Sequence, residues 1–319
     1  MEYSIFSLGS NDGLAKKIAE RLGVKLGEIK CKLFADGEQN VQFLENLRGK
    51  SVFLVQSTNS PADNWARLLL AIDAARGASA KEITAVIPYL GYARQDRKTR
   101  PRVPISARVF AVTLEAVGTD RLLTMDLHND AIGGFYRKTN VDYLYARPVL
   151  ISFFKEFFKD ALTADDIVVV SPDAGGVVRA QSFARRLMRS ADLAIIHKER
   201  EVPNEVARMK LIGDVKGKIA LIVDDSVDTC GTLVTAANLL VENGAREVYA
   251  VVTHGILSGS AQEIIEKSPI KRLFITDTIS SDERRLSPKI EIVSVGDIFG
   301  DAIGRIVKGE SLSALFEAE

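Results

Sequence analysis

The stretch that decides the fold of this chain is Ile219-Ala220-Leu221-Ile222-Val223-Asp224-Asp225-Ser226-Val227-Asp228-Thr229-Cys230-Gly231-Thr232. Its first five residues are all apolar, which predicts a fully buried strand. Two adjacent carboxylates follow at the carboxyl end of that strand, and a tight turn then leads into a segment of helical period. Buried strands joined by helices are typical of parallel sheets, so the stretch predicts an α/β fold.

The same alternation of strand and helix continues in both directions along the chain. We expect strands at residues 3–8, 50–57, 82–88, 121–127, 167–171, 218–224, 247–253, 272–276 and 290–295. We expect helices at residues 12–23, 63–77, 105–118, 148–160, 176–190, 231–243, 258–268 and 297–308. Four glycines are predicted to end helices as C′ caps, namely Gly23, Gly77, Gly118 and Gly244. This pattern predicts mostly parallel, doubly wound sheets.

A short internal repeat favours two domains. Residues 81–87 align with residues 246–252 at an offset of 165 residues, and a Gly-Ala pair precedes each segment. The residues that commonly end a helix before a strand can also produce such a match, so duplication is one of two open interpretations. The length of 319 residues independently favours two domains. We expect similar domains at 1–147 and 148–319, with packing of the last residues on the first domain as a further hypothesis.

Composition argues against several classes of function. The 42 basic residues balance the 42 acidic ones, so no net field attracts nucleic acid or an anionic membrane. No apolar stretch approaches the roughly 20 residues of a membrane helix, and residues 1–13 lack the pattern of a signal peptide. The two cysteines, Cys31 and Cys230, are far apart, which fits a reduced compartment. We expect a cytoplasmic protein that binds neither nucleic acid nor membranes.

The turn from Asp228 to Thr232 has the residue types of a phosphate cradle. At the start of a helix it presents backbone N–H groups and two hydroxyls at the positive end of the helix dipole, where a phosphomonoester binds. The ionised pair Asp224 and Asp225 accepts hydrogen bonds, which suits ribose hydroxyls. The alternative is a helix cap beside a solvated acidic strand end. The strand and the acidic pair in front of the turn favour a ribose 5-phosphate site.

This stretch resembles the phosphoribosyl pyrophosphate loop of two families with a common domain fold. They are the phosphoribosyltransferases and the ribose-phosphate diphosphokinases, also called phosphoribosyl pyrophosphate synthases. The resemblance extends from about Gly9 to Phe316, and it implies two similar α/β domains of the phosphoribosyltransferase type. The remaining motifs distinguish the two families.

Two segments of the first half resemble ATP-binding segments of the synthases. Phe34-Ala35-Asp36-Gly37-Glu38 is by itself a glycine turn between acids, and Arg94-Gln95-Asp96-Arg97-Lys98 opens a loop of five cations that is by itself an ordinary solvated charge run. The first segment resembles the one that holds adenine and ribose of ATP. The second resembles a mobile loop over the triphosphate, which the transferases lack. The implied ATP-binding residues are Phe34, Asp36, Gly37, Glu38, Arg94, Gln95, Asp96 and Lys98.

Two further residues follow predicted strands, at the edge where open α/β sheets bind ligands. His128 follows the strand expected at 121–127, and Asp173 lies in Ser171-Pro172-Asp173-Ala174-Gly175-Gly176. A histidine in this position is more often a structural one, because the sequence shows no second ligand beside it. The resemblance implies that His128 and Asp173 position Mg²⁺ bound to ATP. Such sparse protein ligands agree with a hard cation that keeps several waters.

Lys198 and Arg200 follow an apolar run, where they are unremarkable as members of an exposed loop. By resemblance to the catalytic flexible loop of the family, they become the cations that neutralise charge on the transferring group. The family usually carries arginine between them, whereas this chain has Glu199. That departure affects the expected charge of the loop.

The resemblance implies a ribose-phosphate diphosphokinase that transfers the β,γ-diphosphate of MgATP to the C1 hydroxyl of ribose 5-phosphate. The products are phosphoribosyl pyrophosphate and AMP, for nucleotide biosynthesis. One alternative is a phosphoribosyltransferase, which leaves the Arg94 loop and the Phe34 turn unexplained. The other is a catalytically silent regulatory subunit, which only Glu199 favours. The implied ribose 5-phosphate-binding residues are Arg200, Asp224, Asp225, Asp228, Thr229, Cys230, Gly231 and Thr232.

Assembly and regulation are implied by the resemblance alone. We expect a homo-oligomer, in the family a hexamer, in which the Phe34 turn reaches a neighbouring chain. Residues 311–316 resemble part of an allosteric site through which phosphate activates and ADP inhibits. Residues 129–134 depart from the glutamine-containing stretch that usually follows the histidine. Phosphate and ADP are therefore expected effectors at a site that only partly matches.

Overall fold

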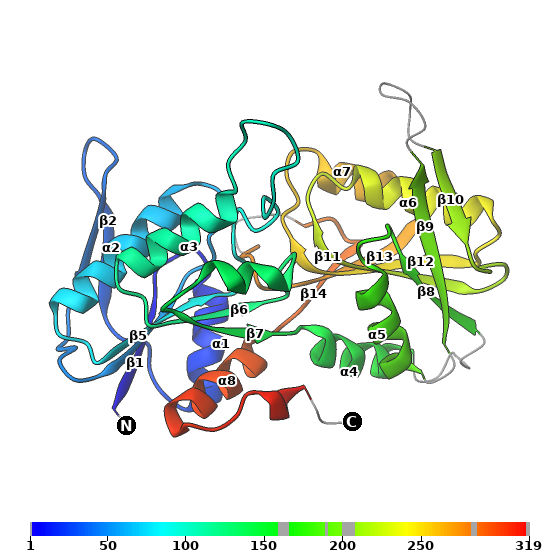
Figure 1. The fold of residues 1–319 in the computed structure, drawn as a ribbon. Coiled ribbons are helices and arrows are strands. Elements are labelled where there is room, and N and C mark those ends of the chain that lie inside the picture. Colours follow the sequence, from blue (N-terminus) through cyan, green and yellow to red (C-terminus); the bar gives the residue numbers. More distant parts are fainter. Residues whose placement is uncertain (1, 159–165, 189–190, 200–207, 282–285, 317–319) are drawn as a thin grey trace. The chain divides into compact units, whose positions relative to one another are not determined.

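The structure of the chain is a computed structural model that describes residues 2–158, 166–188, 191–199, 208–281 and 286–316 (Figure 1). It forms two compact units. Unit 1 comprises Met1–Tyr145, Asp277–Asp282 and Ser294–Glu319, and unit 2 comprises Ala146–Thr276 and Glu283–Val293. The chain thus returns to unit 1 at its carboxyl end.

Unit 1 contains a five-stranded sheet in which all neighbouring strands are parallel. Its central strands are built of buried β-branched and apolar residues, with Val52, Leu54 and Ile83 fully inaccessible to solvent, as expected for a sheet covered on both faces. In spatial order the strands are β1 (Tyr3–Ser7), β4 (Ser51–Val55), β5 (Glu82–Ile87), β6 (Arg121–Met125) and β7 (Asn140–Leu144).

Helices cover both faces of this sheet. Figure 1 shows α1 and α8 together on one side and α2 and α3 on the other. Arg21 of α1 donates two hydrogen bonds to the Asp301 carboxylate of α8, at 2.8 and 3.0 Å, which joins the two helices near their exposed edges. The elements are α1 (Asp12–Leu22), α2 (Asp63–Gly77), α3 (Ser106–Ala116), α8 (Gly296–Lys308) and the 3₁₀ helices η1 (Asp130–Phe135) and η3 (Ser313–Leu315).

A separate antiparallel hairpin, which lies between α1 and β4 in sequence, projects from unit 1 (Figure 1). It consists of β2 (Ile29–Leu33) and β3 (Gln39–Phe43). Neither strand, nor β7, was among the strands expected from the sequence. All three carry polar residues and are largely only half-buried, so they lack the apolar run that marks the central strands.

Unit 2 contains a seven-stranded sheet in which every neighbouring pair is parallel except β10 and β9. The antiparallel strands β9 and β10 lie at one edge of this sheet. They were also not among the strands expected from the sequence. In spatial order the strands are β10 (Arg208–Ile212), β9 (Asp192–Glu199), β8 (Ile167–Ser171), β11 (Ile219–Val227), β12 (Glu247–Gly255), β13 (Ile270–Thr276) and β14 (Ile290–Val293).

Helices also cover both faces of the second sheet, with α4 and α5 on one side and α6 and α7 on the other (Figure 1). An aromatic cluster packs α4 onto the sheet, where Phe154 meets Phe274 of β13 edge to face with ring centroids 4.9 Å apart. The elements are α4 (Arg147–Phe157), α5 (Val177–Leu187), α6 (Gly231–Glu242) and α7 (Ala261–Lys267).

Three of the four predicted glycine caps are confirmed. Gly23, Gly118 and Gly244 follow α1, α3 and α6 with φ of +66°, +97° and +88°. Gly77 was wrongly predicted to be a cap, because α2 includes it and Ser79 takes the left-handed conformation two residues later, at φ +63°. The hydrogen bond from Ala80 N–H to the Ala75 carbonyl closes that end of α2 instead.

The predicted fold class is confirmed. Both units are α/β with mostly parallel sheets, and each predicted strand and helix corresponds to an element at nearly the predicted residues. Within the ranges that the structure describes, no helix combines the length and the hydropathy that crossing a membrane requires.

Candidate functional site

The acidic pair lies within strand β11 of unit 2. The strand was expected to end at residue 224 but continues to Val227, so both acids lie within the strand and Asp224 is paired with Val252 of β12. Their side chains are 26% and 7% exposed, respectively. Two carboxylates that lie this close together repel each other when both are ionised. The groups around them therefore determine which charge state they take.

The turn after β11 leads directly into α6. Cys230 takes a left-handed conformation at φ +65° although it is not glycine, and its side chain is buried. Such a conformation costs free energy and is held only where the surroundings require it. Thr229, Gly231 and Thr232 are exposed, and no side chain caps the first turn of α6.

The first turn of α6 therefore offers an anion-binding site. The first N–H groups of any helix have no partner within the helix, and here they lie at the positive end of the α6 dipole. The hydroxyls of Thr229 and Thr232 are exposed beside them. This arrangement fits the phosphate of a sugar phosphate whose hydroxyls face the acidic pair.

Arg179 contacts both carboxylates of the acidic pair. Its Nη1 lies 3.3 Å from Asp224 Oδ1 and 3.3 Å from Asp225 Oδ1. Arg179 lies in the first turn of α5, 45 residues before Asp224 in sequence. Arg179 was not among the residues predicted from the sequence, where its one local signal is its place on a helix that follows the Asp173 segment.

The environment raises the pKa of Asp224 to about 7. Burial is the main cause, and the neighbouring Asp225 carboxylate adds to it. The Asp225 backbone N–H, which donates to Asp224 Oδ1 at 2.8 Å, and the Arg179 cation oppose the shift. Asp224 is thus poised to change its charge near neutral pH.

Asp173 lies at the same edge of the sheet as the acidic pair, because β8 and β11 are parallel neighbours. Its carboxylate accepts a hydrogen bond from Gly176 N–H at 3.0 Å, and Ser171 Oγ donates to its carbonyl at 2.7 Å. A Cβ on Gly176 would lie 2.9 Å from Ser171 Oγ, so the loop is closely packed. These contacts hold the Asp173 carboxylate, which remains partly exposed.

The donors for a metal ion are sparse. Over the part of the chain that the structure describes, no three His, Cys, Asp or Glu side chains come together as a metal-binding group. His128 is exposed just after β6 in unit 1, whereas Asp173 belongs to unit 2. A few separate oxygen and nitrogen donors fit Mg²⁺ that keeps most of its waters and binds mainly through phosphates.

The predicted catalytic cations are only partly described. The backbone of Lys198 lies near the end of β9, paired with Met209 of β10, and its side chain is not described. Arg200 lies outside the described residues.

The predicted nucleotide turn forms the tip of the β2–β3 hairpin in unit 1. Phe34 and Glu38 are joined by a backbone hydrogen bond of 2.8 Å, and Gly37 takes a φ of +93°. The Asp36 carboxylate accepts from Glu38 N–H at 3.0 Å. Phe34 is 54% exposed at this tip, so an aromatic ring and two acids face outward together.

The basic loop that follows β5 is anchored at its base. Phe110 of α3 stacks against both Trp65 and Tyr92, with ring centroids 4.2 and 4.3 Å apart. Gln95 Oε1 accepts from Ser106 Oγ at 2.6 Å. Asp96 Oδ2 accepts from Asn129 Nδ2 at 2.7 Å, so Gln95 and Asp96 support the loop locally.

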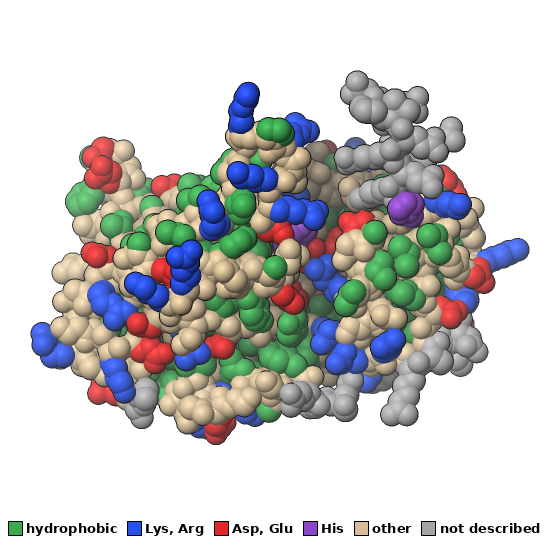
Figure 2. All heavy atoms as spheres, viewed as in Figure 1, with side chains coloured by type: hydrophobic (Ala, Val, Ile, Leu, Met, Phe, Trp, Pro, Cys, Tyr) green, Lys and Arg blue, Asp and Glu red, His purple; other side chains and the backbone are tan. Residues whose placement is uncertain are grey.

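The cations of this loop are exposed beyond its anchored base. They are Arg94, Arg97, Lys98, Arg100 and Arg102. Figure 2 shows Lys and Arg side chains on the surface of the loop. Figure 1 shows the loop and the tip of the β2–β3 hairpin as two separate projections of unit 1. The loop thus combines a rigid base with an exposed positive charge suited to polyphosphate.

Gly91 is predicted to be essential for the position of this loop. A Cβ there would lie 2.1 Å from the Thr58 carbonyl oxygen, which is backbone and cannot move aside cheaply. Gly91→Ala is expected to cost about 1–3 kcal/mol of stability through overpacking and to raise the KM for ATP. Gly77→Ala is the control, because an added Cβ meets no atom within 4 Å there. Thermal melts and ATP kinetics equal to those of the control would contradict the prediction.

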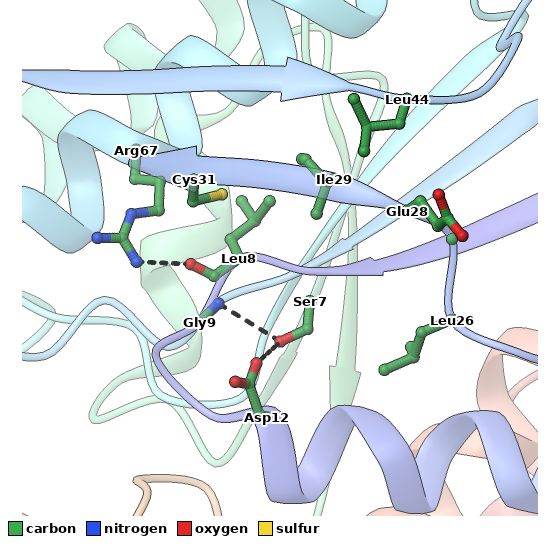
Figure 3. A pocket seen from close by; sticks show the side chains of 11 residues that line it. Ser7, Leu8, Gly9, Asp12, Leu26, Glu28, Ile29, Cys31, Leu44 and Arg67 are labelled. Carbon is green, nitrogen blue, oxygen red and sulfur yellow. Dashed lines mark hydrogen bonds between the residues drawn. The ribbon is translucent and has the colours of Figure 1, made fainter. Parts of the chain in front are cut away.

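A separate pocket of about 500 Å³ in unit 1 contains none of the predicted site residues (Figure 3). It lies between the end of β1, the start of α1 and the base of the hairpin. Its polar side chains are partly engaged with one another: Ser7 bonds to Asp12, and Arg67 donates to the Leu8 carbonyl at 2.8 Å.

The fold defines an α/β protein of the phosphoribosyltransferase type, and unit 2 carries a candidate anion-binding turn after an acidic strand end. Residues 3–118 match the model of the N-terminal domain of ribose phosphate pyrophosphokinase. Residues 200–317 match the model of the phosphoribosyl synthetase-associated domain. Two domain models of one enzyme family thus cover most of the chain.

Whole-chain relatives lead to the same family. A ribose-phosphate pyrophosphokinase of Caldanaerobacter subterraneus is 50% identical over 98% of this chain and 97% of its own length. One of Halalkalibacterium halodurans is 49% identical over 98% and 97%. The crystal structure of phosphoribosylpyrophosphate synthetase from Mycobacterium smegmatis matches with a TM-score of 0.89 and 36% identity, covering 97% of this chain and 100% of that one. The chain belongs to the ribose-phosphate pyrophosphokinase family, whose members are ATP-using diphosphokinases.

Proposed function

We propose that this chain transfers the β,γ-diphosphate of MgATP to the C1 hydroxyl of ribose 5-phosphate, releasing AMP and forming phosphoribosyl pyrophosphate. The observation that carries the proposal is the end of β11, where a partly buried acidic pair precedes a turn into the uncapped first turn of α6. Membership of the family implies that ATP is the donor of the diphosphate.

Phosphorus NMR tests this function directly. The protein is incubated with MgATP and ribose 5-phosphate, and the phosphorus signals are followed with time. Appearance of AMP together with a new diphosphate ester supports the proposal. Formation of ADP, or of no product, would overturn it.

Ribose 5-phosphate is placed by unit 2. The amides at the start of α6 and the hydroxyls of Thr229 and Thr232 bind the 5-phosphate, and Asp224 and Asp225 accept hydrogen bonds from the ribose hydroxyls. Asp228, Cys230 and Gly231 shape the turn. Holding both ends of the sugar orients its C1 hydroxyl toward the β-phosphorus, which converts the encounter into an effectively intramolecular reaction.

The residues that we propose to bind ATP lie in unit 1. Phe34 offers a ring for the adenine, and Asp36, Gly37 and Glu38 offer acceptors and a tight turn for the ribose. Arg94 and Lys98 bind the phosphates, with Gln95 and Asp96 supporting their loop. His128 and Asp173 are the residues that would hold Mg²⁺, which supplies positive charge to the diphosphate. Lys198 and Arg200 neutralise the charge that develops during transfer.

Substitutions in the cradle are expected to affect substrate binding. Thr229→Val removes one hydroxyl donor, and Asp228→Ala removes the side chain that begins the turn. Each is expected to raise the KM for ribose 5-phosphate about tenfold with little change in kcat, because the cradle holds substrate and transition state alike. Thr235→Val, one turn further along α6, is the control, since its hydroxyl donates to the Gly231 carbonyl. Unchanged KM in both cradle variants would place the phosphate elsewhere.

We also propose that the chain acts as a cytoplasmic homo-oligomer, a hexamer by family resemblance, in which the hairpin tip serves a neighbouring chain. Leu33 and Phe34 support this, because these apolar side chains are 60% and 54% exposed at the tip. Activation by phosphate and inhibition by ADP belong to the same proposal, with residues 311–316 as part of the effector site.

Subunit exchange tests whether two chains build one site. Asp36→Ala/Glu38→Ala and Lys198→Ala variants, each expected to be nearly inactive, are unfolded and refolded together. Random mixing in equal parts is expected to restore up to roughly a quarter of wild-type sites, because a mixed interface pairs an intact turn with an intact Lys198. Activity equal to the sum of the separate variants, with mixed oligomers verified by mass spectrometry, would show that each chain carries a complete site.

A further inference from the structure

Arg179, on the helix that follows the Asp173 loop, contacts both members of the acidic pair. A single nitrogen, Nη1, lies 3.3 Å from an oxygen of Asp224 and 3.3 Å from an oxygen of Asp225. The same nitrogen would lie 3.9 Å from a Cβ built on Gly176. The guanidinium therefore lies between the end of β11 and the loop that follows β8.

The contact geometry indicates charge balance and orientation. Charge-assisted N–H···O bonds are usually about 2.7–2.9 Å long, and strong arginine–carboxylate pairs use two nitrogens. Here one nitrogen is shared between two carboxylates at a longer distance. A shared contact reduces the repulsion between the acids and restrains both side chains, and a carboxylate oxygen can accept more than one hydrogen bond.

The orientation of the two carboxylates matters for binding only if a ligand can reach them. Asp224 is 26% exposed, and Arg179 is 29% exposed, so this part of the cluster is accessible from solvent. Asp225 is 7% exposed and is restrained more by its surroundings. A sugar whose hydroxyls donate to the pair would find two acceptors already held in place.

We propose that Arg179 is a positioning residue for the sugar substrate: it holds the carboxylates of Asp224 and Asp225 in the orientation that accepts hydrogen bonds from the ribose hydroxyls. This inference rests on the proposed function, since it assigns the acidic pair to ribose 5-phosphate. A purely structural role, in which Arg179 only fastens α5 to β11, is the competing explanation.

The two roles differ in the kinetic constant that they affect. Loss of a positioning contact weakens binding of substrate and transition state alike, so the KM for ribose 5-phosphate rises while kcat is retained. A loss of packing alone lowers the melting temperature and the fraction of folded enzyme, which lowers apparent kcat and leaves KM unchanged. The KM for ATP reports any wider disturbance.

The test compares Arg179→Gln, Arg179→Lys and Arg185→Gln. Arg185 is an exposed arginine on the same helix and serves as the control. Arg179→Gln is expected to raise the KM for ribose 5-phosphate about 10–100-fold, the usual effect of losing a hydrogen bond to a charged group. The KM for ATP is expected to stay within about twofold of wild type.

Arg179→Lys is expected to recover part of the loss, because a point charge can replace a contact made by one nitrogen. If Arg179→Gln does not fold, Arg179→Lys carries the test, with an expected rise of about 3–10-fold in the KM for ribose 5-phosphate. An unchanged KM in the folded variants, or equal rises for ATP and ribose 5-phosphate, would overturn the inference. Wild-type enzyme that forms no AMP would instead overturn the proposed function.

Discussion

Replacing Lys198 by alanine is expected to lower kcat about 10²–10³-fold, the usual loss when one group that stabilises transition-state charge is removed. The KM for ribose 5-phosphate is expected to change much less. The reason is that charge on the transferring diphosphate and on departing AMP develops during the reaction, so a cation aimed at it acts mainly in the transition state.

Steady-state kinetics with both substrates varied checks this expectation. Lys210→Ala is a matched control, because Lys210 is an exposed lysine on β10, the strand paired with β9. Both variants also need melting curves, so that a folding defect is not read as lost catalysis. A Lys198→Ala enzyme with wild-type kcat would remove Lys198 from the mechanism.

Asp224→Asn is expected to make the enzyme less active and more stable. The catalytic efficiency toward ribose 5-phosphate is expected to fall about 10–100-fold, because a neutral amide replaces a charged acceptor of the sugar hydroxyls. At pH 8 the free energy of unfolding is expected to rise by about 1–2 kcal/mol, because the substitution removes one of two repelling, largely buried charges.

The pH dependence of stability follows from the direction of the pKa shift. Folding raises the pKa of Asp224 to about 7, mainly through burial, whereas an unfolded aspartate titrates near its ordinary value. The folded state therefore holds a proton that the unfolded state has lost, and the free energy of unfolding falls as pH rises from about 4 to about 7. Above that window the cost is constant.

Melting curves of wild type and Asp224→Asn at pH 4.5 and pH 8 measure this effect. The variant is expected to gain stability over wild type at pH 8 and to gain little at pH 4.5. Glu242→Gln, an exposed acid on α6, is the control. In wild type, the KM for ribose 5-phosphate is expected to rise as pH falls below about 7, because a protonated Asp224 loses an acceptor. A stability difference that does not depend on pH would contradict the titration of Asp224.

Local patterns in the chain were enough to predict most of the fold. The central strands β4, β5, β8 and β11 each contain a run of mostly apolar residues, which is typical of strands in a sheet covered on both faces. The turn from Asp228 to Thr232 could also be predicted from the sequence, because the residues that form it are consecutive. The hairpin strands β2 and β3 could not be predicted in this way, since half-buried polar strands lack an apolar run.

Contacts between residues that are far apart in sequence could be identified only in the tertiary structure. Arg179 meets the acidic pair 45 residues along the chain because β8 and β11 are neighbours, an arrangement that no local pattern specifies. The stack of Trp65, Phe110 and Tyr92 under the basic loop has the same origin. The raised pKa of Asp224 also depends on burial among such neighbours. The spacing of apolar residues and the residue types of a turn involve residues that are close in sequence. Burial and charge pairing instead depend on which strands the fold brings side by side.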